Sequence, residues 1–212
     1  MRFLRRAVLA ASLSLTVPLG LAITTDARAS VSIAVEFDTL VKESTSVAII
    51  TPVEQKSVWE NGRIYTYTRV HADQAVAGEL ASGGEAWVRT MGGVVGHIGQ
   101  QVDGEPVLTV GRPSLLFLRA GEAGTLEVTA RAQGQFPVTL DDTKNQKLIR
   151  SGSVGVLLPR KQAAAPVAAV AGQTPAAPTP APALASDVLH NRKLDDGLRD
   201  ISAAWKRLHA SK

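Results

Sequence analysis

An alternating run from Ile64 to Val76 constrains the fold more than any other feature of the sequence. One set of positions is Ile64, Thr66, Thr68, Val70 and Ala72, and the interleaved set is Tyr65, Tyr67, Arg69, His71 and Asp73. Period-two alternation of this length is typical of a β-strand that buries one face. Asn61 and Gly62, just before the run, are a strong two-residue turn signal. The pattern predicts a long strand in a hairpin, and therefore a mainly β protein.

Shorter strand patterns with turn signals between them fill the rest of residues 30–158. Strands are predicted at 47–53, 64–76, 85–90, 115–118, 126–131, 136–140 and 154–158. Leu115–Leu118 is apolar on both faces and predicts a central strand, while Pro52 is expected to end its strand or mark an edge. The spacing of apolar residues predicts one short helix at 35–45. We therefore expect a small OB-like barrel or sandwich with one short N-terminal helix, plus a separate C-terminal amphipathic helix, because closure removes exposed strand edges.

The N-terminus has the pattern of a signal peptide at residues 1–29. Met1–Arg6 is basic, residues 7–23 are apolar, and Ala27 and Ala29 place small residues where a signal peptidase reads, so cleavage is expected before Ser30. The alternative is a retained N-terminal anchor. We expect export to the periplasm, the outer cell envelope or the extracellular space.

Composition changes twice more along the chain. Residues 159–186 are rich in Pro and Ala, and no charged residue occurs from Gln162 to Ser186, which predicts a disordered linker. Residues 187–212 are charged and have helical periodicity, and their apolar stripe is Leu194, Leu198, Ile201, Trp205 and Leu208. We interpret this stripe as a docking helix for a partner or for self-association. The alternative is that it folds back onto the barrel. Its charge is too weak to predict binding to a membrane surface.

Charge and residue types exclude several function classes. The leader holds four arginines and one aspartate, so the net charge falls from +4 to +1 once it is removed. No basic patch for phosphates remains, so nucleic acid is not an expected partner. The chain has no cysteine, which excludes disulfides and thiolate chemistry. We expect no metal, no cofactor and no catalytic residue, because the four histidines lack metal-site spacing and no serine has the Gly-x-Ser-x-Gly pattern.

The outward face of the long strand is the candidate binding surface. Together with the next strand and the tip of a glycine-rich loop, it comprises Tyr65, Tyr67, Arg69, His71, Trp87, Arg89 and His97. Aromatic and arginine side chains are favoured anchors in interfaces. The alternative is that the aromatic residues pack under the terminal helix or a loop. The glycine-rich loop at 92–104 is expected to be structural, or to carry a binding rim with His97 at its tip.

Eight short segments within residues 35–135 form a further pattern: Phe37–Val41, Val47–Ile50, Ile64–Val70, Ala77–Glu79, Gly92–Gly96, Gly104–Pro106, Val110–Arg112 and Leu115–Leu118. In this pattern the chain resembles a widespread group of exported bacterial proteins with no assigned activity. The layout also looks distantly like the OB-type barrel of netrin and metalloproteinase-inhibitor modules. That likeness concerns architecture only, because those inhibitors act through an N-terminal cysteine and disulfides.

The sequence thus predicts an exported, non-enzymatic binding or accessory module that binds or modulates a secreted protein. An extracytoplasmic protein is the expected partner. The alternative is a secreted hydrolase-like enzyme with a site near the 92–105 loop, which would use His97, Glu105 and Arg89.

Overall fold

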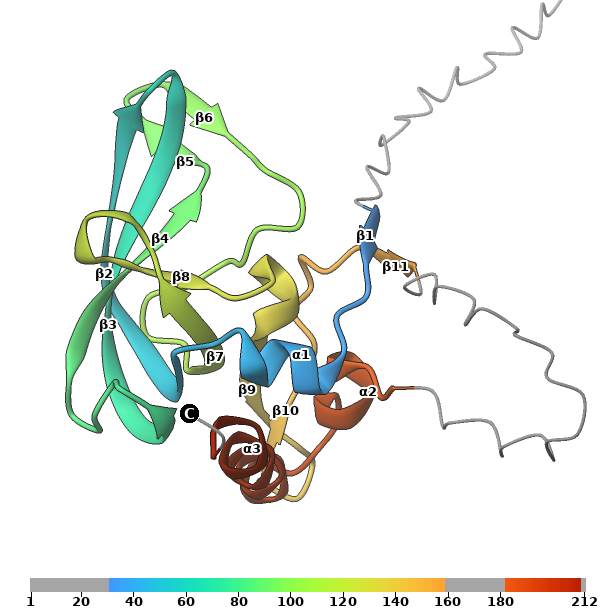
Figure 1. Cartoon of the computed structure of the whole chain (residues 1–212). Helices are drawn as coiled ribbons and strands as arrows, with labels where there is room; N and C mark the ends of the chain where they lie inside the picture. The colour runs from blue at the N-terminus through green and yellow to red at the C-terminus, as the bar shows by residue number, and fades with distance from the viewer. Residues whose placement is uncertain (1–30, 159–181, 211–212) are drawn as a thin grey trace, which may run out of the picture.

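The computed structural model describes residues 31–158 and 182–210 of the chain. The architecture is mainly β, with a closed five-stranded barrel and few helices, as the sequence predicts (Figure 1). The predicted signal peptide and residues 159–181 of the predicted linker lie outside the described residues. Within the described ranges, no helix is long and apolar enough to cross a membrane.

Five strands form the barrel. They are β2 (Ser46–Glu60), β3 (Arg63–Gly78), β4 (Glu85–Met91), β7 (Ser114–Ala120) and β8 (Leu126–Val128). They pair in the order β7-β2-β3-β4-β8, and β8 pairs back onto β7, which closes the barrel. The β4–β8 pair is parallel and the others are antiparallel. Closure protects strand edges that would otherwise be free to pair with another chain.

The remaining elements surround this barrel. The further strands are β1 (Val31–Ile33), β5 (Gly93–Val95), β6 (Ile98–Gln100), β9 (Gln135–Leu140), β10 (Gln146–Leu148) and β11 (Val156–Leu158). The helical elements are α1 (Phe37–Lys42), η1 (Glu122–Gly124), η2 (Arg131–Gly134), α2 (Ala185–Leu189) and α3 (Leu194–His209). β9 and β10 extend the sheet beyond β7, β5 and β6 form a small hairpin, and β1 and β11 form a parallel ribbon.

The long β2–β3 hairpin supplies two of the five barrel strands. Asn61 and Gly62 both have positive φ, 49° and 76°, and they join β2 to β3 as the turn signal predicts. Pro52 does not end its strand, because β2 continues to Glu60. The register shifts between Pro52 and Glu54, so Pro52 occupies a bulge, where its missing N–H does not interrupt the ladder.

Two other strand predictions need adjustment, and one hairpin was not predicted. The strand predicted at 126–131 ends at Val128, because Ala130 and Arg131 both have φ of 54° and lead into η2. The strand predicted at 154–158 shortens to β11, which pairs with β1 and not with the barrel. The glycine-rich loop contains the β5–β6 hairpin, which the sequence pattern did not predict.

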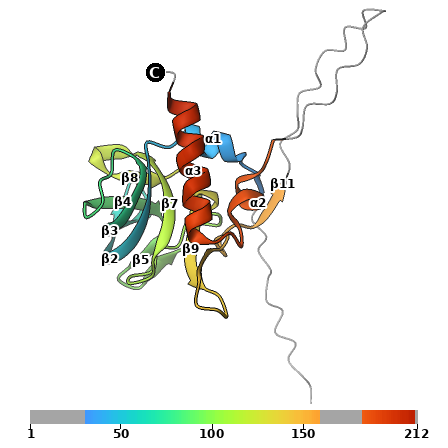
Figure 2. The same cartoon turned by 90° about the horizontal axis from the view of Figure 1, so that it is seen from below.

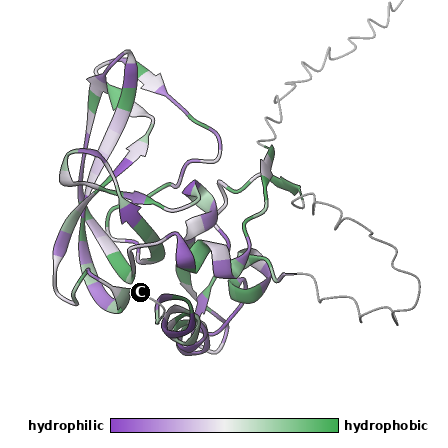
Figure 3. Cartoon of the chain, viewed as in Figure 1, coloured by the Kyte–Doolittle hydropathy of each residue, from purple (hydrophilic) through white to green (hydrophobic). Residues whose placement is uncertain are grey.

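Two apolar cores lie on opposite faces of β2 and β7. Ala48, Ile50, Leu116 and Leu118 point into the barrel. Val47, Ile49, Leu115 and Phe117 point outward and contact the helices. This arrangement confirms the prediction of a central strand at 115–118, all of whose side chains are buried. Figure 3 shows hydrophobic and hydrophilic residues alternating along β2–β4, as expected of strands that bury one face.

The C-terminal helix is present but is not separate from the barrel. α3 lies across β7, β9 and α1 (Figure 2). The structure corrects the prediction of a free docking stripe, because the stripe of Leu194, Leu198, Ile201, Trp205 and Leu208 packs on the apolar core that the barrel leaves uncovered. Gly197 allows this approach, since a Cβ there would lie 2.7 Å from Leu148 Cδ1. The fold-back alternative describes the structure.

Two more contacts fix the helical segment. Arg207 of α3 pairs with Asp38 of α1 at 2.6 Å. The short helix α2 crosses the predicted boundary between linker and helix at 186/187, and its residues Ala185 and Leu189 are buried in the same core. The ordered C-terminal unit therefore begins before the predicted boundary.

Candidate functional site

The outer face of β3 and β4 brings six of the seven predicted surface residues together. The pairs are Tyr67 with Arg89, Arg69 with Trp87, and His71 with Glu85, while Tyr65 lies two residues before Tyr67 on the same face. Residues opposite each other on neighbouring strands share a face, so the predicted alignment of the two strands is correct.

The arginines of this face already form ion pairs with glutamates. Arg69 contacts Glu54 at 2.8 Å and Glu85 at 2.9 Å, and these hydrogen bonds raise the pKa of Arg69. The positive charge of Arg69 is therefore already balanced by carboxylates of the same face. Trp87 is 38% exposed beside this pair and His71 is partly exposed.

Arg89 lies in a more enclosed cluster. Its side chain is 10% exposed, stands 3.7 Å from the centre of the Tyr65 ring, and contacts Glu60 at 3.1 Å and Glu122 at 3.0 Å. Burial lowers the pKa of Arg89, but the hydrogen bond to Glu60 and the nearby negative charges outweigh burial and raise it overall. Tyr67 donates to Glu60 at 2.6 Å, which raises the pKa of the tyrosine and lowers that of the glutamate. This part of the face is a structural cluster.

His97 is not part of this surface. It lies exposed in the turn between β5 and β6. The β5–β6 hairpin lies against the opposite face of β2 and β3, where Gly93 is close to the side chains of Thr66 and Ser57. The structure therefore separates His97 from the six strand residues.

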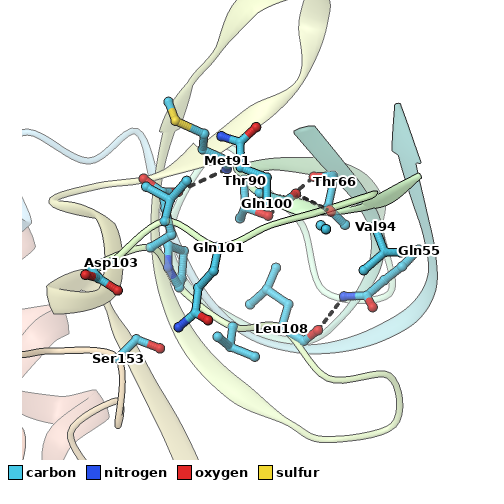
Figure 4. Close-up of a pocket in the computed structure, with 18 of the residues that line it drawn as sticks. Gln55, Thr66, Thr90, Met91, Val94, Gln100, Gln101, Asp103, Leu108 and Ser153 are labelled. Atoms are coloured by element: carbon cyan, nitrogen blue, oxygen red, sulfur yellow. Dashed lines mark hydrogen bonds between the residues drawn. The ribbon is translucent and has the colours of Figure 1, made fainter. Parts of the chain in front are cut away.

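A cavity of about 840 Å³ lies between the end of the barrel and the glycine-rich segment (Figure 4). Its polar side chains are Gln55, Thr66, Thr90, Gln100, Gln101, Asp103, Glu105 and Ser153, and its apolar side chains include Met91, Val94, Val102, Pro106, Val107 and Leu108. Six glycines complete the lining: Gly92, Gly93, Gly99, Gly104, Gly152 and Gly155. The floor reaches Leu108, which belongs to the core inside the barrel.

Glutamine side chains tie the far part of this loop to the barrel. The Gln135 amide accepts from the Val107 N–H at 3.1 Å and donates to the Val107 carbonyl at 2.6 Å, as a neighbouring strand would. Gln55 donates to the Leu108 carbonyl. Because Gln135 is itself buried, its two hydrogen bonds to Val107 are held in a fixed position.

The near part of the loop is held in the same way. Gln100 Oε1 accepts from the Ile64 N–H at 2.8 Å. Glu105 accepts from the Met91 N–H at 3.1 Å and pairs with Arg131 at 3.2 Å. The loop that forms the cavity wall is therefore held in place by the chain's own side chains.

Two glycines of the loop are required by the backbone. Gly92 has φ of 100° and Gly93 has φ of 134°, in the range that side chains disfavour. A Cβ at Gly93 would also lie 2.2 Å from Thr66 Oγ1. The predicted structural role of the glycines is therefore correct at these positions.

The three residues suggested for a hydrolase do not form one site. Arg89 and Glu105 line one small pocket of about 110 Å³, but both are held in ion pairs. Glu105 is occupied by Arg131 and a backbone N–H, and Arg89 is held on the outer face by three glutamates. His97 is at the exposed hairpin turn. In the described ranges, no group of three or more histidines and carboxylates is arranged to hold a metal ion.

Sequence reasoning missed the side chains that form and fix the cavity. Gln55, Gln100 and Gln135 bind backbone groups, and Gln101 and Ser153 line the space. Gln55, Gln100 and Gln135 all lie outside the predicted strands, so the pattern gave no signal for the first group. Nothing in the pattern linked residues 152–155 to the loop, because the two segments are far apart in the chain.

The fold and this cavity define a small β-barrel domain with a preformed, ligand-sized space at one end. Comparisons with family models, with curated proteins and with solved structures found no match.

Proposed function

We propose that the chain is an exported, non-enzymatic binding module of the cell envelope or extracellular space, which binds part of an extracytoplasmic protein in the glycine-loop cavity. The basic and apolar N-terminus, with Ala27 and Ala29 before Ser30, supports export.

The observation that carries the proposal is the preformed cavity. Its volume of about 840 Å³ falls in the range of roughly 300–1,000 Å³ typical of ligand pockets. Its wall is fixed by side-chain hydrogen bonds from Gln135, Gln55 and Gln100, so binding costs little ordering of the loop.

We place the ligand in the cavity and not on the outer face of β3 and β4. The arginines there, Arg69 and Arg89, are already paired with glutamates. A partner would have to break those pairs before using the arginines, which reduces the net gain from contact.

The test compares two tryptophan variants of the exported chain. Gly152 lines the cavity, has no positive φ, and a Cβ there meets nothing within 4 Å, so Gly152→Trp adds a large side chain at the cavity wall with room for its Cβ. Leu140 is exposed on β9 and does not line the cavity, so Leu140→Trp is the matched control. A photo-crosslinking residue replaces Val107, whose exposed side chain lines the cavity, in both backgrounds.

We expect the purified exported chain to begin at Ser30 and to form a discrete crosslinked adduct from position 107. The adduct is lost in Gly152→Trp and kept in Leu140→Trp. Full-length chain retained in the inner membrane, or an adduct that persists in Gly152→Trp, overturns the proposal.

A further inference from the structure

We infer that the cavity selects an extended peptide segment that carries a positive charge, with that charge beside Asp103. This inference rests on the proposed function and names the chemistry of its ligand.

Charge is the first argument. Of the described residues that line the cavity, none is Lys, Arg or His, and two are carboxylates. Glu105 is neutralised by Arg131, which leaves Asp103 as the net charge of the site. Such a site disfavours phosphates, nucleic acids and acidic polysaccharides, and favours a cation.

The lining also argues against flat ligands. No described lining residue is aromatic. Bases and sugar rings are commonly held by stacking on aromatic side chains, and this cavity offers no such platform.

The amide and glycine groups that line the cavity are suited to binding peptide groups. Gln101 extends into the space (Figure 4), and its amide both donates and accepts, as a peptide group does. Glycines line the wall, and without side chains they let another backbone approach closely.

The cavity has a polarity along its length. Asp103 and Ser153 lie at one end, whereas Gln55 and Val94 lie at the other (Figure 4). A peptide would place its lysine, arginine or terminal amine at the first end and an aliphatic side chain near Val94 and Leu108.

The probes are three random hexapeptide libraries of Ala, Val, Leu, Ser and Gln with one fixed residue: lysine, glutamine or glutamate. All are N-acetylated and C-amidated, so the fixed residue alone sets the charge. Retention is measured on the immobilised exported chain, its Asp103→Asn and Gly152→Trp variants, and the Leu140→Trp control. Oligomers of a neutral sugar and of an amino sugar are run in parallel.

We expect the lysine library to be retained most and the glutamate library least. Asp103 is exposed, so Asp103→Asn should lower retention of the lysine library by about two- to fivefold, to the level of the glutamine library. Gly152→Trp should abolish retention, and Leu140→Trp should not.

Equal retention of the lysine and glutamate libraries overturns the inference, as does failure of every library to exceed the Gly152→Trp background. Retention of a sugar oligomer but no peptide, lost in Gly152→Trp, overturns the peptide inference and leaves the binding module in place. Peptide retention that survives Gly152→Trp overturns the cavity as the site of the proposed function.

Discussion

Ile201 lies at the centre of the contact between α3 and the barrel, and its substitution tests whether that helix belongs to the core. The side chain is fully buried in the outer apolar core, which also contains Leu198, Phe117 and Leu148. Ile201→Ala removes three methyl or methylene carbons and leaves a cavity, which costs about 2–5 kcal/mol. In a domain of this size, 1 kcal/mol corresponds to about 2–4 °C, so the melting temperature should fall by on the order of 10 °C.

The assay is urea and thermal unfolding of the purified chain, followed by circular dichroism of the strands. Lys206→Ala is the control, because Lys206 is exposed on the same helix and alanine favours helix. A single transition that shifts for both strand and helix signals is expected for Ile201→Ala. A loss below about 1 kcal/mol, or a helix signal that melts apart from the strands, would refute the reasoning.

Three further changes test the loop and the turn. Gly93→Ala should cost at least about 1–3 kcal/mol, because its φ of 134° and its close contacts exclude a side chain, whereas Gly152→Ala should cost little in the same urea unfolding assay. Gln135→Ala should cost about 1–3 kcal/mol and speed hydrogen exchange of the loop amide that it holds, and unchanged exchange would contradict the role assigned to it. Hydrogen bonds, the largest of them from the Thr143 side chain, lower the pKa of Asp141 to about 2. The stability that this carboxylate gives the β9–β10 turn should therefore persist above about pH 4 and disappear as the pH falls towards 2. A carboxyl NMR titration measures this pKa.

The fold could be predicted where the pattern was local. The alternation over Ile64–Val76, the turn at Asn61 and Gly62, and the apolar run Leu115–Leu118 each determine one element by short-range rules. Pro52 was expected to end its strand or mark an edge. It does not end β2, but the pairing of β2 with β7 stops at Ile50, just before it. Only the pairing of β2 with its two neighbours decides between these outcomes.

The candidate site was harder to predict, because its contacts are long-range. The alignment of Tyr67 with Arg89 followed from strand geometry. The bonds from Gln135 to Val107 and from Gln55 to Leu108 join segments with no shared motif. Sequence alone does not distinguish a glutamine that binds a distant backbone group from an ordinary exposed glutamine.

The C-terminal helix shows why an apolar stripe alone does not identify what covers it. Leu198 and Ile201 recur at helical spacing, and that spacing is the same for a helix that docks on a partner and for one that packs on its own barrel. The difference lies in the surface opposite. Phe117 and Val47 point out of the barrel and share one buried apolar core with α3, so the chain itself supplies both halves of the interface. Partner binding therefore has to be sought at a surface that remains open after the helix has packed, and the preformed cavity lined by Gln101 and its neighbours meets that condition.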